Sequence, residues 1–194
     1  MKDTWKEELE ECTLCPRNCR VNRNAGEKGF CRETDQIMAA RAALHMWEEP
    51  CISGTRGSGT VFFSGCSLRC VFCQNTSIAS GQIGKPISIE RLSEIFLELQ
   101  KQNAANINLV TPTHFVPQIA AALDLAKEQG LSIPVVYNCS GYETVETLRK
   151  MEKYVDIYLP DFKYMSPVLS AKYSHAPDYC EVAKNAVEEM VRQT

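Results

Sequence analysis

Apolar residues along this chain follow two patterns, short continuous runs and repeats at helical spacing. Four short runs are typical of buried strands, and they lie at residues 61–63, 107–110, 135–137 and 155–159. Between the first two runs, apolar residues recur at Leu92, Ile95, Phe96 and Leu99, which predicts an amphipathic helix over 89–100. Short strands that alternate with helices indicate an α/β fold, in which helices cover a parallel sheet.

Capping residues and periodicity define the helices further. Ser88 is a suitable N-cap for the helix over 89–100. A second helix carries an apolar face of Val116, Ile119, Ala120 and Leu123. A third is expected from about 143 to 153, and a last helix begins near Asp178, which forms a capping-box pattern with Glu181. The chain therefore contains four strand–helix units in series.

Strand–helix units of this kind curve toward a barrel, and their active sites lie at the carboxyl ends of the strands. We therefore predict a partial (βα) barrel of about four units, preceded by a small cysteine-rich segment. The expected division is 1–55 for the cysteine-rich segment and its connector, and 56–194 for the barrel. The loops that follow the four strands should converge on one mouth.

Composition excludes several classes of function. The 194 residues carry a formal net charge of −3, which gives no electrostatic footprint for nucleic acid or an anionic membrane. No run of 18 apolar residues is present, and the charged start MKDTWKEELEEC is unlike a secretory signal. Ten cysteines without such a signal indicate metal binding in a reducing cytoplasm rather than disulfides.

Three of these cysteines, Cys66, Cys70 and Cys73, follow the first apolar run directly, within the segment GCSLRCVFCQN. A tight loop can bring three such thiolates to one corner of an iron–sulfur cube. A four-iron cluster normally has four cysteine ligands, so three suggest one iron left open for a small molecule. The alternatives are a zinc site or three buried free thiols, although zinc knuckles usually pair two CxxC units.

Four further cysteines, Cys12, Cys15, Cys19 and Cys31, form a second candidate metal site. Short gaps and intervening turn-forming glycines are compatible with a closed metal knot. Four soft thiolates suit either zinc or an auxiliary iron–sulfur cluster. Unligated cysteines are the remaining alternative.

The segment Gly65–Asn75, with Phe72 before the last cysteine and a glycine-rich approach at 57–59, resembles the radical S-adenosylmethionine (radical SAM) enzymes. The similarity extends to the pyruvate formate-lyase activating enzymes and to an uncharacterised branch with an N-terminal cysteine cluster. It implies a [4Fe-4S] cluster whose open iron chelates S-adenosylmethionine. One electron then cleaves the cofactor to methionine and a 5′-deoxyadenosyl radical, which abstracts hydrogen from a substrate.

The resemblance also implies partners and site residues. An electron donor such as flavodoxin or ferredoxin and a protein substrate, a glycyl radical enzyme, are expected. Cofactor contacts are implied for Thr111 and Thr113, where the family carries Gly-Gly-Glu-Pro, and for Asn138, where it carries Asp-Thr-Asn-Gly. Asp161 and Lys163 match an Asp-x-Lys pattern, in which Lys163 reaches the cofactor carboxylate or the reaction site.

Barrels of this family have more strand–helix units than the four counted here. Either the chain is a truncated copy, which we expect, or a partner supplies the missing strands. The competing functional hypothesis is a non-catalytic module, an iron–sulfur or zinc protein that carries electrons or stabilises a partner. The identity of the substrate does not follow from these residues.

Overall fold

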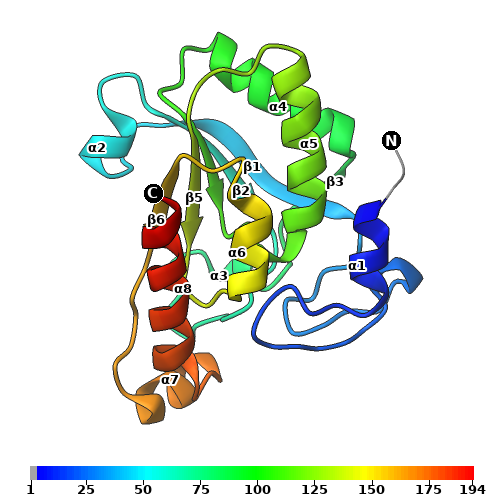
Figure 1. The fold of residues 1–194 in the computed structure, drawn as a ribbon, viewed down its shortest axis with the longest axis vertical. Coiled ribbons are helices and arrows are strands. Elements are labelled where there is room, and N and C mark those ends of the chain that lie inside the picture. Colours follow the sequence, from blue (N-terminus) through cyan, green and yellow to red (C-terminus); the bar gives the residue numbers. More distant parts are fainter. Residues whose placement is uncertain (1–3) are drawn as a thin grey trace.

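The structure, a computed structural model, describes residues 4–194 and contains a six-stranded sheet with long helices along one face (Figure 1). The strands are β1 (Ile37–His45), β2 (Ser58–Phe63), β3 (Lys85–Ile87), β4 (Ile107–Val110), β5 (Val135–Cys139) and β6 (Ile157–Pro160). The α-helices are α1 (Glu7–Glu10), α2 (Pro50–Ser53), α3 (Thr76–Ala79), α4 (Ile89–Lys101), α5 (Val116–Glu128), α6 (Val145–Met151), α7 (Pro167–Ser174) and α8 (Tyr179–Gln193). Short 3₁₀ segments are η1 (Thr4–Lys6), η2 (Arg23–Ala25) and η3 (Thr113–Phe115).

The strand order is β3-β1-β2-β4-β5-β6, and β2, β4, β5 and β6 run parallel. These four are the strands predicted from the apolar runs, and each is followed by a helical segment. The sheet is open rather than closed, so the predicted partial (βα) barrel is confirmed. β1 pairs antiparallel with β2 and β3, which places a strand from residues 1–55 in the same sheet as the barrel strands.

The two faces of the parallel sheet have different surroundings. Val61, Leu109, Tyr137 and Tyr158 align across the strands on the face that the long helices cover, and the first three are fully buried. The next residues form a second row, Phe62, Val110, Asn138 and Leu159, which is only half-buried. We call this second side the open face. This second row lies along the carboxyl ends of the four strands, which is the edge where barrel active sites lie.

The helices match the predicted periodicity with adjusted ends. In α4 the Ser88 hydroxyl accepts a hydrogen bond from the Arg91 backbone N–H at 3.1 Å, and the four predicted apolar residues are buried. α6 is shorter than the predicted 143–153 because Thr144 is its N-cap and accepts from the Thr147 N–H at 3.3 Å. The prediction of a capping box at Asp178 is wrong, because the Asp178 side chain makes no capping hydrogen bond to α8. Its carboxylate instead accepts a hydrogen bond from the Tyr142 hydroxyl at 2.8 Å.

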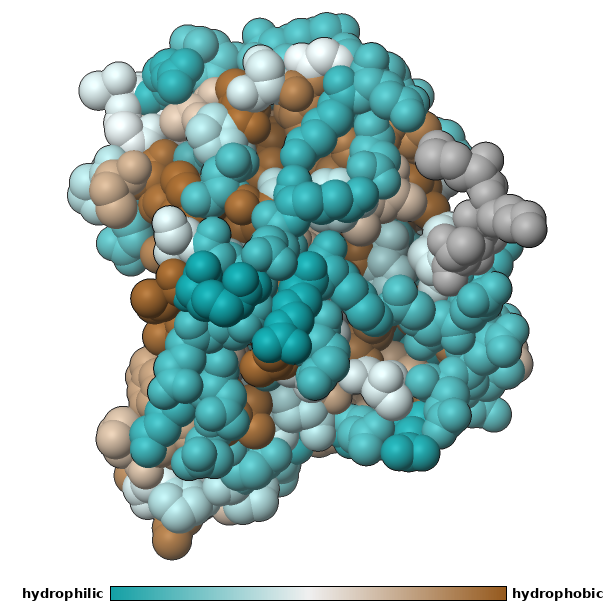
Figure 2. Space-filling model, viewed as in Figure 1, coloured by the Kyte–Doolittle hydropathy of each residue, from teal (hydrophilic) through white to brown (hydrophobic). Residues whose placement is uncertain are grey.

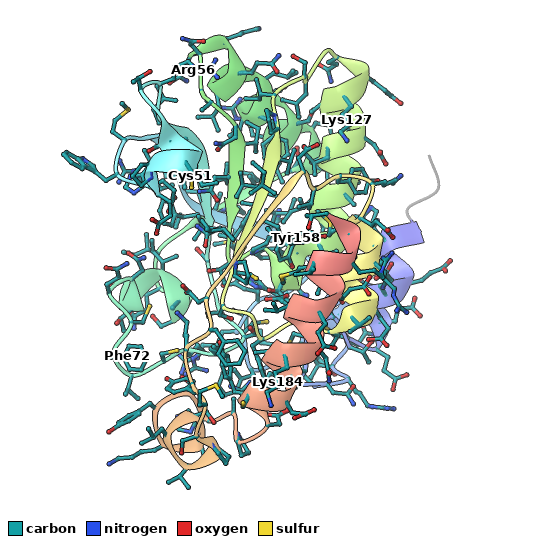
Figure 3. The ribbon with its side chains drawn as sticks, turned by 60° about the vertical axis from the view of Figure 1, so that its left-hand side comes forward. Cys51, Arg56, Phe72, Lys127, Tyr158 and Lys184 are labelled. Atoms are coloured by element: carbon teal, nitrogen blue, oxygen red, sulfur yellow. The ribbon has the colours of Figure 1, made fainter. Side chains whose placement is uncertain are left out.

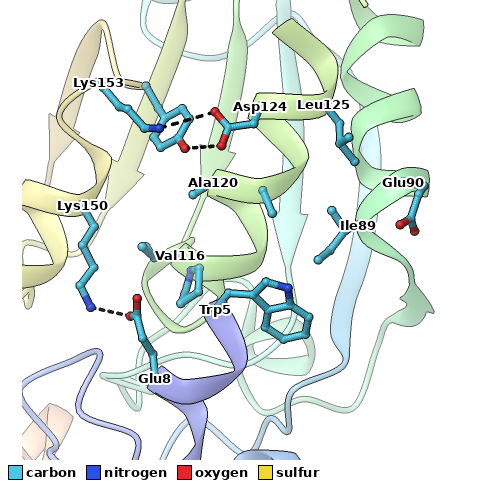
Figure 4. A pocket seen from close by; sticks show the side chains of 13 residues that line it. Trp5, Glu8, Ile89, Glu90, Val116, Ala120, Asp124, Leu125, Lys150 and Lys153 are labelled. Atoms are coloured by element: carbon cyan, nitrogen blue, oxygen red, sulfur yellow. Dashed lines mark hydrogen bonds and ion pairs between the residues drawn. The ribbon is translucent and has the colours of Figure 1, made fainter. Parts of the chain in front are cut away.

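A hollow of about 630 Å³ lies on the helical side, between the N-terminal helical turns and α4, α5 and α6 (Figure 4). Trp5 lies at one end of it, and Glu8 pairs with Lys150 at 2.5 Å. No cysteine lines this hollow, so it is separate from both cysteine groups. Among residues 4–194, no helix combines the length and the apolar character needed to span a membrane.

Candidate iron–sulfur and cofactor site

The three-cysteine loop begins directly after β2, at the carboxyl edge of the sheet. Gly65 starts the loop with a φ of +80°, and a Cβ there would lie 2.6 Å from the Cys31 carbonyl oxygen. Only glycine therefore permits this close approach to the N-terminal segment. The backbone then turns so that the Cys73 N–H donates to the Cys70 carbonyl at 3.1 Å. Cys70 is buried, whereas Cys66 and Cys73 are half-buried.

Hydrogen-bond donors point at two of the three sulfurs. The Leu68 and Arg69 backbone N–H groups donate to Cys66 Sγ at 3.4 and 3.5 Å, and the Ser174 hydroxyl donates to Cys70 Sγ at 2.9 Å. Burial raises the pKa of the Cys66 thiol, those two N–H groups lower it, and the nearby Cys70 and Cys73 raise it. The three thiols are therefore close enough to interact electrostatically. Soft sulfur donors with N–H and O–H groups directed at them fit an iron–sulfur cluster.

The N-terminal cysteines form a second group with a different internal arrangement. Burial raises the pKa of the Cys15 thiol most, the Arg17 backbone N–H lowers it, and the neighbouring Cys31 and Cys12 raise it further. Cys19 contacts the chain next to Cys31, where its sulfur accepts from the Phe30 N–H at 3.3 Å. The set is chemically suited to a soft metal. Among residues 4–194, no three His, Cys, Asp or Glu side chains stand close enough to hold a single ion, in either cysteine group.

Arg17, within the Cys15–Cys19 segment, connects the N-terminal group to the three-cysteine loop. Its guanidinium donates to the Ser67 carbonyl at 2.7 Å, to the Ser174 carbonyl at 2.7 Å and also to the His175 carbonyl. It also stacks 3.8 Å from the centroid of the Phe30 ring. A planar guanidinium can make several such bonds at once, which an ammonium cannot do in the same geometry. Arg17 therefore links the N-terminal cysteine segment to the three-cysteine loop and to the end of α7.

The loops that follow the parallel strands contact one another. The Thr111 N–H donates to the Asn138 carbonyl at 2.9 Å, and Thr111 itself has a left-handed φ of +56°. His114, fully buried, places Nε2 2.6 Å from the Ser64 carbonyl beneath the cysteine loop. Gly141 also lets two loops meet, since a Cβ there would lie 2.5 Å from the Asp161 carbonyl oxygen. The predicted convergence of the loops is thus present.

The predicted cofactor residues lie at this edge, but they differ in how deeply they are buried and in their bonding partners. Asn138 is half-buried on the open face, and Lys163 Nζ forms an ion pair with Asp161 at 2.5 Å. Thr113 is almost fully buried, and its hydroxyl donates to Glu143 at 2.9 Å, so its side chain faces the protein interior. The predicted contacts of Thr111, Thr113, Asn138, Asp161 and Lys163 with S-adenosylmethionine stay predictions.

Several residues around the site were not identified from the sequence. Glu143 is buried, accepts from Thr113 and from the Tyr137 hydroxyl at 3.1 Å, and burial raises its pKa to about 8. Ser174, at the end of α7, reaches Cys70 from a segment that looked like an irregular loop. Neither residue belongs to a recognisable motif, so no local signal marked them.

Comparison with known proteins agrees with this geometry. The radical SAM superfamily matches residues 60–192, which include the three-cysteine loop and most of the parallel sheet. The chain is also 31% identical over 185 residues to "Uncharacterized protein MJ0674" of Methanocaldococcus jannaschii, covering 91% of this chain and 52% of that protein. It therefore spans about half the length of this relative. Because the family match covers well over half of the sequence, the chain belongs to the radical SAM superfamily.

Proposed function

We propose that this protein cleaves S-adenosylmethionine reductively and uses the product radical to abstract hydrogen from a substrate. The observation that carries the proposal is the loop at the end of β2, where donors point at the sulfurs of Cys66 and Cys70. With Cys73, these residues would bind three irons of a [4Fe-4S] cluster and leave the fourth for the cofactor. When bound, the reduced cluster supplies one electron that breaks a carbon–sulfur bond, giving methionine and a 5′-deoxyadenosyl radical.

The polar residues at the strand ends would position the cofactor. We infer that the Lys163 ammonium binds the methionine carboxylate, with Asp161, its partner at 2.5 Å, setting the position of the ammonium. The Tyr179 hydroxyl accepts from the Lys163 N–H at 2.8 Å and donates to the Ser140 carbonyl at 2.7 Å. This arrangement fixes the Lys163 backbone relative to the loop after β5. The Asn138 amide and the Thr111 hydroxyl are the remaining candidate contacts on that edge.

For the substrate we propose a protein, and by resemblance a glycyl radical enzyme. Exposed apolar side chains surround the cysteine loop and the start of α7, and they are 43–72% exposed: Val71, Phe72, Phe162, Met165, Val168 and Leu169. Figure 3 shows Phe72 at the edge of the molecule, and its ring lies 6.3 Å from that of Tyr173 in α7. Apolar side chains also reach the surface along the left-hand edge and lower tip in Figure 2. Contiguous exposed apolar surface is typical of protein interaction sites.

The proposed function is tested by anaerobic reconstitution with iron and sulfide, followed by electron paramagnetic resonance of the reduced protein. We expect a four-iron signal that changes on addition of S-adenosylmethionine, together with formation of 5′-deoxyadenosine. A flavodoxin or ferredoxin should replace the chemical reductant. A cluster signal that the cofactor leaves unchanged would contradict the proposal and favour a non-catalytic electron carrier.

Cysteine variants locate the cluster. Cys70→Ala should abolish the cofactor-sensitive signal and 5′-deoxyadenosine formation, because three ligands leave none to spare. Cys12→Ala should keep that signal while removing the second metal, whose identity as iron or zinc elemental analysis would give. Cys51→Ala, at an exposed position in α2, is the matched control and should change neither quantity. Full iron content and cleavage in Cys70→Ala would contradict the assignment.

A further inference from the structure

One cluster ligand, Cys70, is the end of a buried chain of hydroxyl groups. The Ser174 Oγ lies 2.9 Å from Cys70 Sγ, and the Tyr164 hydroxyl lies 2.6 Å from the same Ser174 Oγ. Ser174 is fully buried, and Tyr164 and Cys70 are each less than a tenth exposed. The chain is therefore shielded from water, which would otherwise compete for each hydrogen bond.

The direction of this chain follows from the chemistry of its end. A thiolate bound to iron has no proton and can only accept, so the single Ser174 proton points at Cys70 Sγ. The Ser174 oxygen then accepts from the Tyr164 hydroxyl. Each bond polarises the next, so the Tyr164 donor strengthens the bond that Ser174 makes to the sulfur.

The position of Ser174 is fixed from two sides. The Val71 N–H in the cysteine loop donates to the Tyr173 carbonyl at 2.9 Å, which ties the loop to the last turn of α7. Arg17 bridges the Ser67 and Ser174 carbonyls at 2.7 Å each. α7 ends with His175 in a left-handed conformation, φ +53°, so the helix stops where these contacts hold it. The Ser174 hydroxyl is thus held in place at Cys70 by contacts on both sides.

We propose that Ser174, supported by Tyr164, raises the reduction potential of the cluster by donating a hydrogen bond to its ligand Cys70. The inference rests on the proposed function, since it requires a cluster on Cys66, Cys70 and Cys73. Reduction adds negative charge to the cluster and its sulfurs, and a donor aimed at a sulfur stabilises that charge. Ser174 is therefore a positioning and tuning residue, and the radical chemistry itself does not pass through it.

The test is an electron paramagnetic resonance redox titration of the reconstituted full chain and its variants. Ser174→Ala should lower the ratio of reduced to oxidised cluster at a fixed potential by about tenfold, a shift of about 59 mV for one electron. Tyr164→Phe should move the potential in the same direction by a smaller amount. Ser174→Thr keeps a hydroxyl and should restore most of the potential.

Ser170→Ala is the matched control. Ser170 is also fully buried in α7, but its hydroxyl donates to the Pro167 carbonyl at 3.2 Å rather than to a cysteine sulfur. The reduction potential of the cluster in Ser170→Ala should equal that in the wild type. Equal potentials for wild type, Ser174→Ala and Ser170→Ala would overturn the inference. If Ser174→Ala fails to assemble a cluster, Tyr164→Phe decides, and an unchanged potential there overturns it.

These outcomes are separable from failure of the proposed function. If the wild-type chain assembles no cluster on the three cysteines, the proposed function fails before any potential is compared. If the cluster assembles and S-adenosylmethionine changes its signal, but the potentials do not differ, only the role of Ser174 fails.

Discussion

At the scale of single residues, Glu143 is a carboxyl group that the fold encloses completely among hydroxyls and a thiol. Thr113 and Tyr137 donate to its two oxygens at 2.9 and 3.1 Å, and the nearby Cys139 thiol, as a third donor, also lowers its pKa. Burial is the largest influence on the pKa of Glu143 and raises it, while these three donors lower it. The net pKa is about 8, so the folded protein holds Glu143 protonated near neutral pH. The surrounding donors reduce the cost of burial without removing it.

This balance predicts how stability depends on pH. Because the pKa of Glu143 rises from 4.5 in the unfolded chain to about 8 in the folded one, its contribution is complete below pH 4.5 and is lost as pH rises through 8. Glu143→Gln stays neutral at every pH and lacks this loss. Between pH 5.5 and 8, the variant should therefore gain roughly 3 kcal/mol relative to the wild type. Urea unfolding at both pH values measures this, and parallel pH profiles for the two proteins would contradict it.

At the scale of elements, α4 shows a helix whose sequence, cap and packing agree. Its buried residues Leu92, Ile95, Phe96 and Leu99 form the predicted apolar face against the sheet. Ser88 satisfies the Arg91 N–H, one of the backbone donors that a helix start leaves without a partner inside the helix. On the exposed side, Arg91 pairs with Glu94 and Glu98 at 3.0 and 2.6 Å. Local and tertiary preferences thus favour the same conformation.

The cap of α4 should have a measurable effect on stability. Ser88→Ala removes the acceptor for the Arg91 N–H and should lower the free energy of unfolding by about 1 kcal/mol. Ser88→Asn keeps a side-chain acceptor and should stay within a few tenths of a kcal/mol of the wild type. Denaturant unfolding of the three proteins compares them directly. A similar loss in both variants would mean that the hydroxyl acts through another contact.

The elements that the sequence predicted well are those with strong internal periodicity or unbroken apolar runs. α4, β4 and the parallel arrangement of β2, β4, β5 and β6 follow from such patterns. α7 lacks an apolar face and was not expected, because contacts with the cysteine loop, such as Val71 N–H to the Tyr173 carbonyl, hold it in place. At Asp178 the sequence predicted a local capping contact that the structure lacks. The Asp178 carboxylate instead accepts a hydrogen bond from Tyr142, which is distant in the sequence. Long-range contacts of this kind leave no signature in a short window.

At the scale of the whole molecule, the N-terminal segment packs against the carboxyl edge of the barrel and is hydrogen-bonded to its loops. Buried Arg23 donates to the His114 carbonyl at 2.5 Å, and the Thr147 hydroxyl of α6 donates to the Leu14 carbonyl at 2.8 Å. Arg69 in the cysteine loop donates to the Phe30 carbonyl at 3.1 Å. These contacts join the N-terminal cysteine segment to the loops around Cys66, Cys70 and Cys73, so we expect the two cysteine groups to be coupled structurally.

Arg17 is where this coupling is tested most directly, since its one guanidinium bonds carbonyls of both the cysteine loop and the end of α7. Arg17→Ala should lower the free energy of unfolding by about 2–4 kcal/mol, because charged donors are lost to three backbone carbonyls. It should also speed loss of the iron–sulfur absorption in air, since Ser67 and Ser174 flank the ligands. Arg17→Lys keeps the charge without the planar fork and should recover less than half of the stability that Arg17→Ala loses.

Arg20→Ala is the control: it removes an exposed ion pair with Glu11 and should lower the free energy of unfolding by under about 1 kcal/mol, with no change in cluster lifetime. Equal cluster lifetimes in Arg17→Ala and Arg20→Ala would mean that Arg17 does not couple the two cysteine groups.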